Sequence, residues 1–170
     1  MKWLDGLVDR IGQLEKAVGV FLVLAIVAMI AVQVVTRYFF DQPLAWVEEL
    51  ATYAFIWTVF IGASYALKGQ RHISIEAFQL LLSARSRVWL QLFIWCSILV
   101  FLVVVIPQAF KVMSVESRSK SVSLPIDIPR MWFYSFPLAL SCCSMLITSV
   151  QGVLHTLSRL MKPTEPGAHA

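Results

Sequence analysis

Four stretches of this 170-residue chain contain no Asp, Glu, Lys or Arg, and they constrain the fold more than any other feature. A helix needs about 20 mostly apolar residues to cross a bilayer, and inside lipid its backbone amides must pair within the segment. We therefore predict an all-α integral membrane protein with four transmembrane helices. The charge-free stretches are Ala17–Thr36, Leu50–Leu67, Val88–Phe110 and Met131–Ser158, with 20, 18, 23 and 28 residues. The spans are expected at about residues 17–36, 44–68, 88–111 and 130–155.

The composition excludes several other classes of protein. Apolar residues make up 59% of the chain and charged residues only 14%, whereas typical soluble proteins are about a quarter charged. The net charge of +4 comes from few and scattered basic residues, so nucleic acid is not an expected partner. The cysteines Cys96, Cys142 and Cys143 lie in apolar runs and match neither a disulfide framework nor a metal-ligand spacing.

The distribution of Lys and Arg predicts how the chain is oriented. The N-terminal segment, the second loop and the C-terminal tail together carry nine of these residues, and the first and third loops carry five. Because cytoplasmic loops are enriched in Lys and Arg, both termini are expected in the cytoplasm. The charge-free first span is expected to stay uncleaved, since the sixteen residues before it include three acidic ones and are unlike a signal peptide.

Residues 1–16 are predicted to form a separate amphipathic helix in the plane of the membrane surface. Apolar side chains from Trp3 to Leu14 fall within one arc of a helix, while Lys2 and Asp9 fall on the opposite side. The alternative is an ordinary cytoplasmic extension of the first span. The expected organisation is an interfacial helix at 1–16, a four-helix membrane domain at 17–158 and a cytoplasmic tail at 159–170.

The charge-free stretches offer no groups for transport or catalysis. Ionisable residues within a membrane usually mark functional sites, and these four stretches contain no acidic or basic side chain. The histidines His72, His155 and His169 do not supply two imidazoles at matching depth for haem. We therefore expect no enzyme, no cofactor and no metal site. A membrane redox subunit and a self-sufficient small four-helix transporter are the alternatives, and the latter would be expected to contain a buried acid.

One polar cluster lies where the first predicted span ends and the second begins. Arg37 and Tyr38 close the first span, and Trp46, Glu48 and Glu49 open the second. Taken alone, the cluster is consistent with an interfacial turn in which tryptophan lies at the membrane surface and the acids stabilise a helix N-terminus. It is also consistent with a contact to another protein.

The same residues resemble a known family. Arg37-Tyr38, Pro43-Leu44, Trp46 and Glu48-Glu49-Leu50 are similar to the pattern of the small membrane subunit of tripartite ATP-independent periplasmic (TRAP) transporters, the DctQ-like family. Further residues continue the resemblance, namely Phe55-Ile56-Trp57, Gly62-Ala63, Tyr65-Ala66-Leu67 and His72-Ile73. The resemblance covers roughly residues 20–150 and is strongest in the first half.

The resemblance implies a non-catalytic scaffold subunit in the inner membrane of a bacterium. Such a subunit pairs with a large multi-span membrane subunit, which holds the sodium and substrate sites and moves as an elevator. An extracytoplasmic solute-binding protein delivers an organic acid such as a dicarboxylate or a sialic acid. The substrate is chosen by the other chains. The residues expected at the subunit interface are Arg37, Tyr38, Trp46, Glu48 and Glu49 at the outer edge, with Arg71 and His72 at the cytoplasmic edge.

Overall fold

The computed structural model describes residues 2–69, 84–119 and 128–161 of the chain. Within these ranges the elements are α1 (Lys2–Phe39), α2 (Ala45–Gly69), α4 (Ala84–Glu116), the short 3₁₀ helix η1 (Arg130–Trp132) and α5 (Ser135–Met161). All four α-helices are long and apolar enough to cross a membrane. The prediction of an all-α chain with four apolar helices is therefore confirmed, whereas the orientation of the termini stays a prediction.

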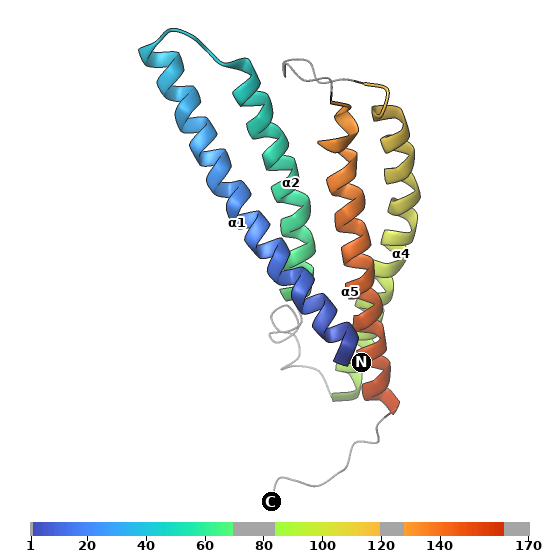
Figure 1. Ribbon diagram of the computed structural model, residues 1–170. Coiled ribbons are helices and arrows are strands. Elements are labelled where there is room, and N and C mark those ends of the chain that lie inside the picture. Colours follow the sequence, from blue (N-terminus) through green and yellow to red (C-terminus); the bar gives the residue numbers. More distant parts are fainter. Residues whose placement is uncertain (1, 70–83, 120–127, 162–170) are drawn as a thin grey trace, which may run out of the picture.

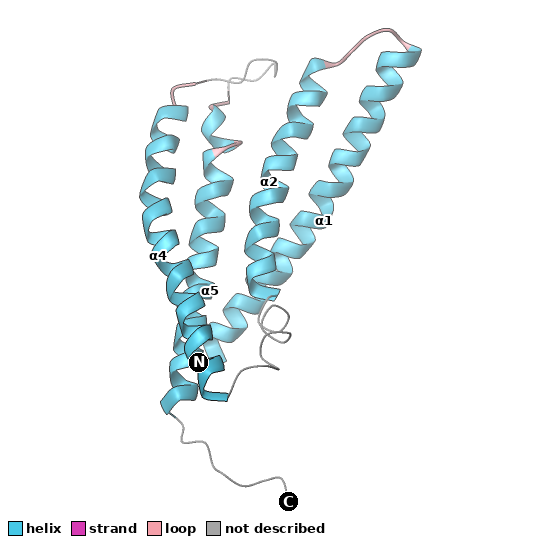
Figure 2. Ribbon diagram, turned by 180° about the vertical axis from the view of Figure 1, so that it is seen from behind, coloured by secondary structure: helices cyan, strands magenta, loops and turns pink. Residues whose placement is uncertain are grey.

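The four α-helices pack as two hairpins that meet along α2 and α5 (Figures 1 and 2). In the first hairpin α1 lies along α2, and in the second α4 lies along α5. α1 is inclined, so that its N-terminal end lies near α5 while its C-terminal end points away from α5. The connection between α1 and α2 consequently lies at the end of the bundle opposite the N-terminus.

Residues 2–16 belong to α1 and do not form the separate in-plane helix that the sequence predicts for residues 1–16. α1 continues without a break from Lys2 to Phe39, and this segment contains no proline that would interrupt it. Val8 is only 2% exposed, and a Cβ placed on Gly12 would lie 3.4 Å from the side chain of Lys68. The segment therefore packs one face on the bundle, and this burial keeps it in line with the rest of α1.

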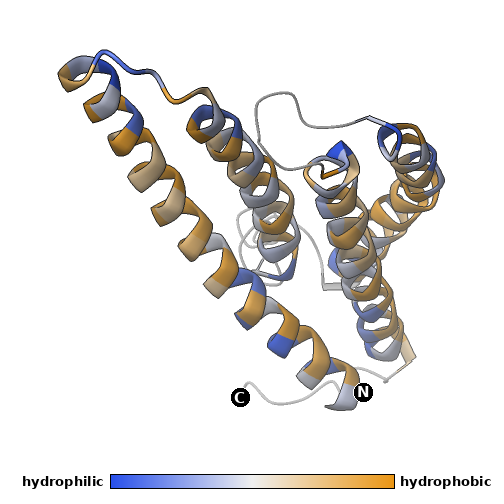
Figure 3. Cartoon of the chain, turned by 45° about the horizontal axis from the view of Figure 1, so that its top comes forward, coloured by the Kyte–Doolittle hydropathy of each residue, from blue (hydrophilic) through white to orange (hydrophobic). Residues whose placement is uncertain are grey.

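The described helices bury polar side chains and expose apolar ones. Apolar residues predominate along α1 in Figure 3, and large side chains such as Phe21 and Phe93 are each 70% exposed. This pattern fits a lipid solvent, in which small and polar residues contribute much of the contact between helices. The polar side chains that are at most 2% exposed are Ser64, Ser135, Thr148, Ser149, Gln151 and Thr156.

α4 and α5 approach each other closely at Gly152. The indole ring of Trp95 covers this glycine, and a Cβ added to Gly152 would lie 2.4 Å from two of the ring atoms. Trp95 is itself only 8% exposed. The absence of a side chain at Gly152 thus lets a large aromatic ring fill the space between the two helices.

Candidate functional site

The structure places the polar cluster predicted from the sequence at the tip of the first hairpin, which we define as residues 37–49. Arg37 and Glu48 line the same groove between α1 and α2, which has a volume of about 400 Å³. No ion pair joins them among the described residues. Tyr38 and Trp46 point outward and are 77% and 44% exposed. The structure therefore brings Arg37 and Glu48 together but leaves both aromatic side chains free to meet lipid or another protein.

Glu49 differs from its neighbour because it bonds a side chain, Tyr53, that packs against the second hairpin. It accepts a hydrogen bond from the hydroxyl of Tyr53, one helical turn further along α2. The Tyr53 ring is 2% exposed, stacks on Phe133 with ring centroids 4.0 Å apart and meets Tyr134 edge to face at 5.5 Å. This aromatic cluster, which the sequence analysis did not foresee, ties α2 to the start of α5.

Arg71 and His72, the second predicted contact, lie outside the described residues, so that contact stays a prediction. Among the residues that the structure describes, no group of three His, Cys, Asp or Glu side chains is arranged to hold a metal ion. Of the cysteines in this part of the chain, Cys142 is buried, while Cys96 and Cys143 are exposed.

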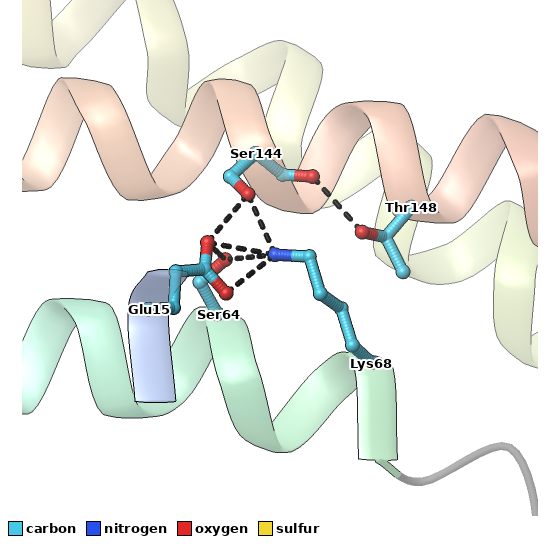
Figure 4. A network of polar contacts seen from close by, with 5 residues as sticks. All are labelled: Glu15, Ser64, Lys68, Ser144 and Thr148. Carbon is cyan, nitrogen blue, oxygen red and sulfur yellow. Dashed lines mark hydrogen bonds and ion pairs between the residues drawn. The ribbon is translucent and has the colours of Figure 1, made fainter. Parts of the chain in front are cut away.

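A buried ion pair lies between α1, α2 and α5 (Figure 4). The Lys68 Nζ atom is 2.6 Å from Oε2 and 2.7 Å from Oε1 of Glu15. The two side chains are 7% and 12% exposed, respectively. Ser64 Oγ donates to Glu15 Oε1 at 2.8 Å and accepts from Lys68 at 3.0 Å. Ser144 Oγ makes the same two contacts, each at 2.7 Å.

These four residues, here called the Glu15–Lys68 network, satisfy each other's hydrogen-bonding groups. An ammonium group has three N–H donors, and Lys68 has three acceptor residues in Glu15, Ser64 and Ser144. A buried ion pair is tolerated when further hydrogen bonds offset the cost of removing the charges from water. Because the partners come from three helices, the network holds α1, α2 and α5 at one relative position.

The charge-free stretches do not reveal this network, because each of them describes a single helix by itself. Glu15 and Lys68 lie just outside two of these stretches, so the stretches themselves are free of charge as predicted. The helices are offset along one another, however, and both charges lie beside Ser144, near the middle of α5. One feature of the sequence does indicate a polar face on α5. Polar residues recur on α5 at alternating spacings of three and four, at Ser141, Ser144, Thr148, Gln151 and His155.

A second polar contact joins the N-terminal part of α1 to α5. His155 Nε2 lies 2.8 Å from Asp5 Oδ1, and the Gln151 side-chain amide donates to the same oxygen. Gln151 is 2% exposed. Together with the Glu15–Lys68 network, this contact places the acidic side of α1 against the polar face of α5.

The fold and these contacts define a multi-pass α-helical membrane protein whose buried polar groups join its own helices. Comparison with known families is more specific. Residues 26–159 match the family described as tripartite ATP-independent periplasmic transporters, DctQ component. The chain belongs to this family. It is a small permease component of a TRAP transporter and is not an enzyme.

Three relatives illustrate the match. The chain is 27% identical over 125 residues to the sialic acid TRAP transporter permease protein SiaT of Haemophilus influenzae, covering 74% of this chain but 20% of SiaT. It is 27% identical over 129 residues to the small permease protein SiaQ of Vibrio cholerae, a sialic acid TRAP transporter protein, covering 75% and 73% of the two chains. The chain is also 29% identical over 83 residues to the C4-dicarboxylate TRAP transporter small permease protein DctQ of Vibrio cholerae. That match covers 46% of this chain and 36% of DctQ.

Proposed function

We propose that this chain is a non-catalytic scaffold subunit of a sodium-coupled TRAP transporter for organic acids. It pairs with a large multi-span membrane subunit and supports the elevator motion of that subunit. An extracytoplasmic solute-binding protein delivers the substrate, a dicarboxylate or a sialic acid, to the assembled pair. The chain lies in the bacterial inner membrane, with both termini in the cytoplasm.

The saturated Glu15–Lys68 network is the observation that carries this proposal. A group that binds a transported ion or acid must have free donors or acceptors in at least one state. Here the ammonium of Lys68 is shared among Glu15, Ser64 and Ser144. The Glu15 carboxylate in turn accepts from Lys68, Ser64 and Ser144. The buried charges therefore serve helix packing, which is the chemistry of a scaffold.

The relatives support the role of a partner-dependent subunit. SiaT, named as a sialic acid TRAP transporter permease protein, is about five times as long as the part of it that this chain matches, since that part is 20% of its length. The chain thus spans one fifth of this relative, and transport by the whole assembly is part of the proposal. Relatives named for sialic acid and for C4-dicarboxylate support a carboxylate substrate without selecting one.

We place the contact with the large subunit at the residues that the sequence singled out. These are Arg37, Tyr38, Trp46, Glu48 and Glu49 at the hairpin tip and Arg71 and His72 at the opposite edge. Within the tip, Trp46 has the properties of an anchor, because it is an aromatic residue exposed at a helix start and large aromatic side chains dominate protein interfaces. Arg37 has no ion-pair partner among the described residues, so its guanidinium is available to an anionic group that approaches the tip.

Co-purification with the large subunit tests this proposal. A tagged chain is expressed with its large TRAP subunit, and the amount of the large subunit recovered is measured for Trp46→Ala and Arg37→Ala. Both variants are expected to recover less of it. Trp89→Ala, which removes an indole that is 59% exposed on α4, is the matched control and should assemble normally. Unchanged recovery in both tip variants would contradict the proposed contact.

A further inference from the structure

The groove at the hairpin tip has the shape of a site for one lipid chain. It lies between α1 and α2 and has apolar walls that include Ile26, Ile30 and Phe55, while Arg37 and Glu48 lie at its mouth. From Ile26 to Arg37 the helix rises by roughly 16 Å at 1.5 Å per residue. This length is about half of a hydrocarbon core about 30 Å thick, so the groove spans about one leaflet.

Three polar groups along this groove have unused hydrogen-bonding capacity. The side chains of Arg37 and Glu48 have no hydrogen-bond or ion-pair partner among the described residues. Gln33, one turn before Arg37, also lines the groove, and its side-chain oxygen is buried without a hydrogen bond. Buried polar atoms are nearly always paired, so an unpaired one in an open groove points to a ligand.

The exposed aromatic residues around the mouth indicate its depth. Tyr38, Phe39 and Phe40 are 77%, 80% and 67% exposed. Tyrosine and tryptophan gather where lipid headgroups meet the hydrocarbon, and both Tyr38 and the 44% exposed Trp46 lie at this tip. The mouth with Arg37 and Glu48 is therefore at headgroup level, and the apolar walls lie at the depth of the acyl chains.

We infer that the groove between α1 and α2 binds one phosphatidylethanolamine molecule. Its phosphate pairs with Arg37, its ammonium group pairs with Glu48, and one acyl chain lies along Ile26, Ile30 and Phe55. When the Gln33 amide is turned by 180° about its last side-chain bond, its nitrogen takes the place of the unpaired oxygen and donates to an ester carbonyl of the lipid.

The charges at the mouth select this headgroup over other phospholipids. One cation and one anion side by side complement a zwitterion, and a primary ammonium can donate hydrogen bonds to a carboxylate. A phosphatidylglycerol molecule in the same place would set its phosphate beside Glu48 with no cation of its own. A free phosphate ion would leave the apolar walls unfilled.

This inference goes beyond the proposed function and is tested without the large subunit. In the assembled transporter the lipid would form part of the surface at the tip, beside Tyr38 and Trp46. A failure of subunit co-purification would therefore leave the lipid measurement unaffected, and the reverse also holds.

The test is lipid retention by the full chain. The protein is placed in nanodiscs containing equal amounts of phosphatidylethanolamine and phosphatidylglycerol with the same acyl chains. It is then transferred to mild detergent, and the retained lipids are counted by native mass spectrometry. Wild type is expected to retain phosphatidylethanolamine about fivefold over phosphatidylglycerol, the preference that one partly exposed ion pair provides.

Variants at the mouth of the groove test which charged side chain sets the lipid preference. Glu48→Gln should abolish the preference, and Glu48→Lys should reverse it, because two cations favour an anionic headgroup. Arg37→Gln should instead lower the retention of both lipids, because both carry the phosphate that pairs with Arg37. Asp41→Asn and Arg118→Gln change exposed charges outside the groove and should behave as wild type; asparagine also tolerates the φ of 50° at Asp41. Circular dichroism and gel filtration verify that each variant is folded.

Equal retention of the two lipids by wild type would overturn the inference. So would an unchanged preference in Glu48→Lys. If a peptide from the large subunit, rather than any lipid, is found cross-linked along Ile26 and Ile30 in the assembled complex, the groove is a protein interface and the inference is wrong.

Discussion

The ammonium group of Lys68 at the end of α2 lies 2.6 Å from the carboxylate of Glu15 in α1, with 7% and 12% of the two side chains exposed. Nothing in the charge-free stretches indicates that these residues meet, because 53 positions separate them. Their contact, completed by Ser64 and Ser144, joins three of the four long helices. The stability of the bundle should therefore depend on this pair more than on any exposed charge.

Removing one member of the pair should strongly destabilise the chain. Lys68→Met leaves the Glu15 carboxylate buried without its countercharge, which should lower the free energy of unfolding by about 3–5 kcal/mol. Unfolding by sodium dodecyl sulfate in mixed micelles, followed by circular dichroism, measures this change. Lys16→Met removes an exposed charge from the same part of α1 and should change stability by less than about 1 kcal/mol.

Replacing both members tests whether the cost comes from the isolated charge. A buried ion pair can be exchanged for apolar residues at little cost, so Glu15→Leu combined with Lys68→Leu should be more stable than Lys68→Met. If Lys68→Met unfolds like Lys16→Met, the pair does not contribute to the stability of the bundle.

Adding one methyl group at Gly152 should separate α4 from α5. A Cβ there would lie 2.4 Å from the Trp95 ring, and overpacking of this kind costs about 1–3 kcal/mol. Gly62→Ala is the matched control, since a Cβ at Gly62 meets no atom within 4 Å. Trp95→Leu makes room for the methyl group. In that background, Gly152→Ala should therefore lower the free energy of unfolding by less than it does in the wild-type chain. Equal unfolding of Gly152→Ala and Gly62→Ala would contradict this packing.

The hydroxyl of Tyr53 should matter more than that of an exposed tyrosine. Tyr53→Phe keeps the stacked ring but removes the hydrogen bond to Glu49, and a hydrogen bond to a charged group contributes about 1.5–3 kcal/mol. Tyr53→Leu also removes the ring stack and should lower stability further. Tyr38→Phe, at a residue 77% exposed, provides the baseline in the same unfolding assay. A wild-type unfolding curve for Tyr53→Phe would show that this bond is not important.

The sequence was sufficient to predict the helices but not how far they extend or how they are offset. Charge-free stretches indicate where helices can cross a membrane, because the rule depends on each segment alone. The single helix from Lys2 to Phe39 could not be predicted this way, since the amphipathic pattern of residues 1–16 is the same whether its polar side faces water or the polar residues of α5. Asp5 meets His155, on α5, 150 positions away, and periodicity does not reveal such a pairing.

The tip residues likewise combine features that the local sequence predicts with one that depends on a distant part of the chain. Their sequence pattern singles out Arg37, Trp46, Glu48 and Glu49. Adjacent residues on a helix point about 100° apart, so Glu48 and Glu49 turn to different sides of α2. Which glutamate faces which partner depends on the second hairpin. Tyr53 and Phe133 determine the partner of Glu49, because they occupy the side of α2 to which Glu49 turns.

Solute uptake by reconstituted vesicles tests the central claim most directly. Vesicles containing this chain alone, or this chain with its large subunit, are given labelled sialic acid or a C4-dicarboxylate, the solute-binding protein and an inward sodium gradient. A scaffold subunit predicts accumulation only when the large subunit is present, and none with this chain alone. Sodium-dependent accumulation by the chain alone would contradict the account.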